Sequence, residues 1–234
     1  SMVAAGELRR YADSLESGIA VADRLAESLG LPYVATAQDV ERILLLAQLC
    51  SATNKPASGW FDDSRPGDRR RVIDGLQAAL TTLDQREAEA RPYFTDAALR
   101  GPVAGLLDRF RNQHRGLKKL SSTYRADKRL VGEMLASDVT VAEGIKGLER
   151  AVAWADAHFT FQVAAEAGGH SLGSYWQGRA TDFDNAKDAV AVVDRVRDAL
   201  AGLPMNDRLL GQLTMVSRVS LLPVVDELTV AIDM

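Results

Sequence analysis

The sequence predicts an all-α fold, an elongated helical bundle with long antiparallel helices in the form of a stalk or arm. Apolar residues recur every three or four positions through most of the 234 residues, which is typical of amphipathic helices. No segment alternates apolar and polar residues as a half-buried strand does. We therefore interpret residues 1–234 as a single helical domain. The apolar end, Leu228 to Met234, leads us to expect a fragment of a larger protein.

Composition excludes several classes of protein. A formal net charge of −4 gives no general attraction to nucleic acid or to an anionic membrane, so any such binding has to come from a local patch. No apolar run approaches the ~20 residues of a membrane span, so we expect no membrane partner. The one cysteine, Cys50, cannot form an internal disulfide and fits a reducing, cytoplasmic location.

The first part of the chain, residues 3–51, is predicted to be a helical hairpin. Its first helix ends at Gly30-Leu31-Pro32, and Thr36 or Asp39 begins the second. The segment 51–67 has no periodicity, but Trp60 in its middle predicts a loop anchored to the core.

Central helices are predicted over residues 68–135. The first runs from about Asp68 to Ala90, and Pro92 kinks or ends it. Thr95 and Asp96 start another helix, Gly101-Pro102 interrupts it, and successive short helices follow.

Residues 139–202 are predicted to form a long antiparallel helix pair. Thr140 and Glu143 match a capping box at the start of the first helix. Its inward residues are predicted from a coiled-coil-like alternation of four and three, at Val141, Ile145, Leu148, Val152, Ala155, Phe159 and Val163. The second helix runs from Phe183 to Leu200, and two terminal helices are expected within residues 206–232.

The corner between the two long helices, Gly168 to Asp184, is rich in glycine and aromatic residues. Leu172, Tyr175 and Trp176 have the spacing of one buried helical turn. The residues that we expect to anchor the corner and start the next helix, with Thr181 and Asp182 as caps, are Tyr175, Trp176, Thr181, Asp182 and Phe183.

Catalytic and metal-binding patterns are missing from the sequence. It has neither a phosphate-binding loop nor a Gly-x-Gly-x-x-Gly motif. His114, His158 and His170 are far apart in sequence, and Glu166 is separated from His170 by two glycines. Asp62-Asp63 is better explained as a turn cap than as a metal pair. We predict no catalytic residue, no metal and no cofactor within this chain.

A basic stripe is the strongest electrostatic feature. Between Arg109 and Arg129 the only acidic residue is Asp127, and Tyr124 and His114 are interleaved with the cations. Such a stripe can follow a phosphate backbone, although a solvated helix face is the commoner explanation. The candidate nucleic-acid-binding residues are Arg111, Arg115, Lys118, Lys119, Arg125, Lys128 and Arg129.

Four segments in order resemble a known family. They are Leu29-Gly30-Leu31-Pro32 with Thr36, Trp60 after a Pro-containing loop, Ser121 to Arg125, and Leu172-Gly173-x-Tyr175-x-x-Gly178-x-x-Thr181-Asp182-Phe183. Together they resemble the helical insertion of large bacterial superfamily 1 DNA/RNA helicases of the AAA type, which often carry a restriction-endonuclease-like C-terminal domain. Phe183 stands where that family commonly has Trp.

The resemblance implies an accessory domain inside an ATP-dependent motor. ATP and Mg²⁺ would then belong to the parent protein, whose motor domains would be partners of this chain together with DNA or RNA. Two other hypotheses remain open, namely a structural or protein-interaction bundle without nucleic-acid binding, and a self-contained helical enzyme, for which no convergent polar residues are evident.

Overall fold

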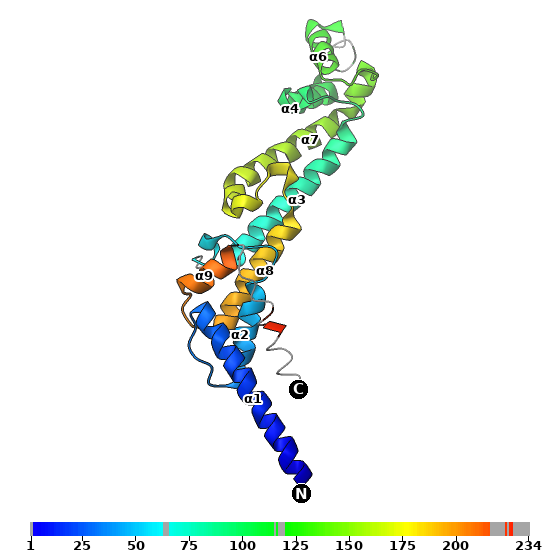
Figure 1. Ribbon diagram of the computed structural model, residues 1–234. Helices are drawn as coiled ribbons and strands as arrows, with labels where there is room; N and C mark the ends of the chain where they lie inside the picture. Colours follow the sequence, from blue (N-terminus) through cyan, green and yellow to red (C-terminus); the bar gives the residue numbers. More distant parts are fainter. Residues whose placement is uncertain are drawn as a thin grey trace. The chain divides into compact units, whose positions relative to one another are not determined.

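The computed structural model describes residues 2–62, 66–114, 116, 120–215, 223, 225 and 226, with side chains from residue 16 onward apart from that of Pro66. This part of the chain is all-α, as predicted: it consists of helices and loops, with one isolated antiparallel bridge between Phe94 and Leu135. Figure 1 shows the order of the helices.

Two compact units make up the chain. One, unit 1, contains Ser1–Arg70 and Asp182–Met234, and the other, unit 2, is the continuous segment Arg71–Thr181. The sequence was interpreted as a single helical domain. Each unit has a hydrophobic cluster of its own.

Unit 1 is built on the predicted N-terminal hairpin. Helix α1 (Met2–Leu29) packs against α2 (Ala37–Leu49) and α9 (Asp207–Thr214), while α2 also packs against α8 (Phe183–Leu200). Thr36 begins α2 with a capping box completed by Asp39. The hydrogen bond from the Thr36 hydroxyl holds the pKa of Asp39 below its usual value.

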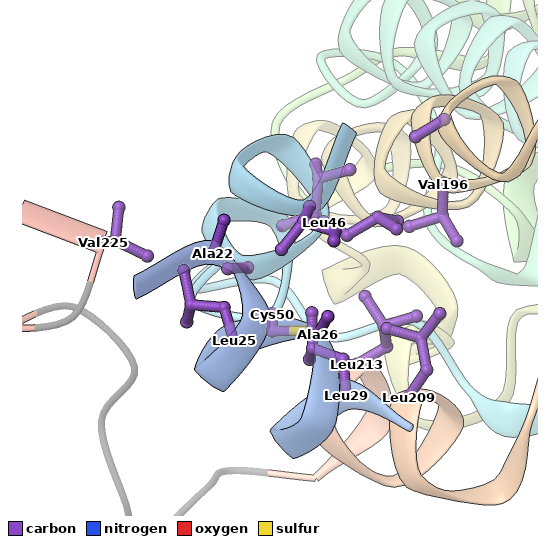
Figure 2. Close-up of a cluster of buried hydrophobic side chains, with 14 of the residues drawn as sticks. Ala22, Leu25, Ala26, Leu29, Leu46, Cys50, Val196, Leu209, Leu213 and Val225 are labelled. Carbon is purple, nitrogen blue, oxygen red and sulfur yellow. The ribbon is translucent and has the colours of Figure 1, made fainter. Parts of the chain in front are cut away.

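The core of unit 1 collects one face of each of these helices. Figure 2 shows Leu25 and Leu29 of α1 gathered with Cys50, Leu209 and Leu213. Burial raises the pKa of the Cys50 thiol to about 12, so the thiol is apolar filler rather than a nucleophile.

Trp60 anchors the aperiodic loop of unit 1, as predicted. It lies in a short 3₁₀ turn, η1 (Ser58–Trp60), and is 3% exposed. The Arg69 guanidinium lies 4.8 Å from the centre of its ring, and Arg197 donates a 3.0 Å hydrogen bond to its carbonyl.

Unit 2 is organised around the long helix α7 (Val141–Gly168), which packs against α4 (Ala97–Arg100), α5 (Val103–Asp108) and α6 (Ser122–Glu133). Figure 1 shows α4 and α6 near the start of α7. Helix α3 (Pro66–Ala90) crosses from unit 1 into unit 2 between Arg70 and Arg71. The predicted capping box of Thr140 and Glu143 starts α7.

The buried face of α7 agrees with the predicted one up to Ala155 and differs from it beyond that residue. Leu148 is buried, and Val141, Ile145, Val152 and Ala155 pack against the core of unit 2. Phe159 and Val163 are 67% and 48% exposed, whereas Trp154 and Phe161 are buried in the core. Residues 151–165 are apolar almost all round the helix, so periodicity alone does not select a face, and the two large aromatic side chains decide it. The predicted pairing of α7 with α8 stays a prediction, because the two helices belong to different units.

The corner after α7 is two 3₁₀ turns, η4 (Gly169–Tyr175) and η5 (Gly178–Ala180). Leu172 is fully buried, but Tyr175 and Trp176 are only half-buried, so the prediction of one buried turn holds for Leu172 alone. Gly173 and Gly178 have φ of 58° and 60°, a conformation that favours glycine.

Thr181 and Asp182 have different roles from those predicted for the pair. Asp182 is the N-cap of α8, and its carboxylate accepts a 3.0 Å hydrogen bond from the Asn185 amide. Thr181 is not a cap, because its hydroxyl forms hydrogen bonds within the preceding turn. It accepts one from the Gln177 amide and donates one to the Gly178 carbonyl. Phe183, the first residue of α8, is buried as expected for an anchor.

The predicted terminal helices are only partly covered by the structure. The first is α9, which ends at Thr214. The second lies outside the described residues, apart from Val225, which is buried in unit 1, and Asp226.

Candidate nucleic-acid interface

Helix α6 divides the basic stripe into an inward and an outward face. Its N-cap is Ser121, whose hydroxyl accepts a 3.1 Å hydrogen bond from the Tyr124 amide. Asp127 and Val131, four residues apart, are buried. Lys128 and Arg129 follow Arg125 by three and four residues, so the three side chains share the other face of the helix, and all three are exposed.

Asp127, the only acid of the stripe, is turned inward and is 4% exposed. Its carboxylate accepts hydrogen bonds of 2.8 and 3.0 Å from the Arg109 guanidinium, and His114 Nε2 lies 2.7 Å from Oδ2. The Arg109 hydrogen bond, followed by that of His114, holds the pKa of Asp127 below its usual value. The same bond raises the pKa of Arg109. The outward face of α6 therefore carries three cations that Asp127 does not interrupt.

Three aromatic rings lie between the segment before α6 and α6 itself. Phe110 belongs to η2 (Arg109–Gln113), a single π-helical turn that continues α5, and His114 follows it. The rings of Phe110, His114 and Tyr124 meet edge to face, with centroids 5.0 to 5.9 Å apart. Lys128 Nζ lies 5.9 Å from the centroid of Tyr124. These contacts fix η2 against α6.

The remaining candidate cations have mixed surroundings. Arg111 forms an ion pair with Glu149 of α7, and Arg129 forms one of 3.5 Å with Glu133. Arg115, Lys118 and Lys119 lie outside the described residues, so the structure does not place them beside α6. The geometry thus supports Arg125, Lys128 and Arg129 as one surface, and it leaves the contribution of residues 115–119 as a prediction.

The cluster of Arg109, His114 and Asp127 was not predicted from the sequence. One signal of the cluster was available in the sequence, namely Asp127 itself. A single acidic residue among many basic ones is expected to form an ion pair with one of them. The spacing of His114 four residues after Phe110 was a second signal. Neither signal specified an inward direction, because that depends on how α6 packs against α7.

No other part of the described chain offers a better site. Groups of three or more His, Cys, Asp or Glu close enough to hold a metal are not found among the described residues. An apolar hollow of about 310 Å³ in unit 1 is lined by Leu31, Tyr33 and Leu203, with the Asp39–Arg42 ion pair at its edge. Within the described ranges, no helix has both the length and the hydropathy needed to cross a bilayer.

The comparisons with known proteins give no family for this chain: no protein-family model matches it, and no curated protein or solved structure does.

Proposed function

We propose that this chain is a non-catalytic helical accessory domain that binds nucleic acid through the outward face of α6. The observation that carries the proposal is the set of Arg125, Lys128 and Arg129 on one exposed helix face, with the interrupting acid Asp127 buried on the other. Exposed cations that bind phosphates release the counterions condensed on the nucleic acid, and this release drives binding.

The parent protein is proposed from the sequence resemblance. An insertion of a superfamily 1 helicase would position or contact nucleic acid, while motor domains elsewhere in the parent bind ATP and Mg²⁺. A phosphate-binding loop and helicase motifs in the full reading frame would support this parentage, and a reading frame without them would remove it.

The test is a salt titration of DNA binding by the full chain. Fluorescence anisotropy with a labelled 20-base-pair duplex at 50 to 200 mM salt is expected to show affinity that falls steeply with salt. In the triple variant Arg125→Gln, Lys128→Gln and Arg129→Gln, the slope of log affinity against log salt should shrink by about 0.9 for each lost phosphate contact.

The matched control removes three cations elsewhere. Arg24, Arg71 and Arg195 are all exposed and lie outside α6. Changing these three to Gln alters the net charge by the same amount, so it separates a local effect from a global one. Equal losses in both triple variants, or no binding at the lowest salt, would contradict the proposal.

A protein-interaction bundle is the second candidate function. Phe159 and Val163, four residues apart on α7, are 67% and 48% exposed. A chain that binds a protein partner through this pair and has no affinity for DNA at low salt would favour this second function.

A further inference from the structure

We infer that the outward face of α6 recognises the sugar–phosphate backbone alone, without stacking any base. This inference rests on the proposed function and specifies its ligand class, a polyphosphodiester read by charge. The evidence for it is the burial and the contacts of the aromatic rings beside the outward face of α6.

Stacking of a nucleobase needs an aromatic face that is open to solvent. The rings interleaved with the stripe are Phe110, His114 and Tyr124. His114 is 6% exposed and bonded to Asp127, and Phe110 and Tyr124 are half-buried. Among the residues that the structure describes between Arg109 and Glu133, the strongly exposed large apolar side chain is that of Leu120, which has no aromatic ring.

Tyr124 is the ring nearest the cations, and its surroundings oppose stacking. Phe110 and His114 contact it edge to face, at 5.9 and 5.1 Å between centroids. The Lys128 ammonium lies toward its ring, 5.9 Å from the centroid. These contacts occupy part of the Tyr124 ring, which is half-buried. The cations of α6 are therefore left to act on phosphates, whose spacing does not depend on sequence.

The experiment compares two labelled single strands of equal length in binding to the full chain. One carries thymine at every position, and the other is abasic at every position with the same phosphates. We expect dissociation constants within about twofold of each other. A stacking surface would instead lose about 5- to 150-fold for each base removed.

Two variants keep the test independent of folding defects. Tyr124→Leu keeps an apolar side chain but removes the ring, and Tyr124→Phe keeps the ring and its edge contacts. Both should bind the thymine strand as the unchanged chain does, provided that their far-UV circular dichroism is unchanged. Arg125→Gln should weaken binding to both strands by the same factor.

The outcomes separate this inference from the proposed function. Binding that falls tenfold or more on the abasic strand would overturn backbone-only recognition while leaving nucleic-acid binding in place. Binding to neither strand would overturn the inference, and it would overturn the proposed function as well if the duplex is not bound either. Binding to vesicles of anionic phospholipid, with exposed Leu120 entering the bilayer and no binding to either strand or to the duplex, would assign the surface to a membrane and would overturn both.

Discussion

Asp127 pairs with two residues of the basic segment, Arg109 and His114. Its two carboxylate oxygens take both hydrogen bonds of Arg109 and the imidazole of His114, so these residues are occupied inside unit 2. A buried carboxylate without such partners would be strongly destabilising. The sequence predicted that the segment is basic, but it did not predict that Arg109 and His114 pair with Asp127, since this depends on tertiary contacts.

The stability of this cluster should depend on pH in a defined direction. The folded-state pKa of Asp127 lies below its unfolded value of about 3.9, so its contribution is complete above that pH and is lost as pH falls through the folded pKa. We expect Asp127→Asn to lower the free energy of unfolding by about 2 kcal/mol at pH 7. This is less than the ~3–5 kcal/mol of fully buried pairs, because the Arg109 side chain is 29% exposed.

Urea unfolding at pH 7 and at pH 3 measures this effect. The difference between the unchanged chain and Asp127→Asn should be clearly smaller at pH 3. Glu133→Gln, which removes an exposed acid of the same helix, should change the free energy by less than about 0.5 kcal/mol at either pH. A difference for Asp127→Asn that is the same at both values would show that the ionised carboxylate is not what stabilises the cluster.

The corner after α7 is held in place by close packing and by one arginine. The Trp176 ring lies near Phe161, with 6.4 Å between centroids, and it also covers the backbone of Gly169. Arg179 reaches from η5 to α3, with 2.6 Å to Asp84 and 2.8 Å to Glu87. The exposed fraction of Trp176 is intermediate, so its role is to cover Gly169 and not to fill the centre of the core.

A methyl group at Gly169 should loosen this corner. Gly169 has helical backbone angles, so alanine fits its conformation, but the added Cβ would lie 2.5 Å from the Trp176 ring. We expect Gly169→Ala to lower the free energy of unfolding by about 1–3 kcal/mol, which is typical of overpacking. Thermal or urea unfolding with intrinsic tryptophan fluorescence measures the change.

Gly75 provides the matched control for that substitution. It lies in α3, is exposed, and has no atom within 4 Å of an added Cβ. Gly75→Ala should raise the free energy of unfolding by about 0.5–1 kcal/mol because alanine favours the helix. If Gly169→Ala is as stable as Gly75→Ala, the close contact with Trp176 is not a constraint.

The elements that were predicted correctly depend on local interactions. The Thr140–Glu143 capping box and the Asp182 cap each involve residues three apart, so the sequence contains the whole interaction. Beyond Ala155, the inward face of α7 depends on which of two apolar sides meets the core of unit 2. Trp154 and Phe161 are seven residues apart, as are Val152 and Phe159, so helical spacing supported either side equally.

At the scale of the whole molecule, the chain leaves unit 1 within α3 and returns to it at Asp182. The buried residues of the hydrophobic cluster of unit 2 lie between Leu83 and Phe161, and the residues that pack against them, such as Ala79, Leu80 and Trp176, also belong to unit 2. The cluster of unit 1 needs residues from both chain segments, including Leu46 of α2 and Val196 of α8. The periodicity of apolar residues predicted the helices but not this division into two units, because periodicity does not specify which helices share a core.

A segment of residues 66–181, which keeps α3 whole, should therefore fold by itself. We expect helical far-UV circular dichroism and one cooperative urea transition. The matched segment, residues 2–62, contains α1 and α2 without α8 or α9, and it should give no cooperative transition. A 66–181 segment without helical signal would show that the cluster of unit 2 does not suffice for folding.

The return of the chain at Asp182 also sets an order of events during synthesis. Helices α1 and α2 leave the ribosome first, but α8, which completes their core, follows only after all of unit 2 has been translated. At ~5–20 residues per second, this delay is roughly 5–20 s. During that time the apolar faces of α1 and α2 have no final partner, whereas unit 2 already has every residue of its own core. We therefore expect nascent unit 1 to need protection by chaperones for longer than unit 2 does.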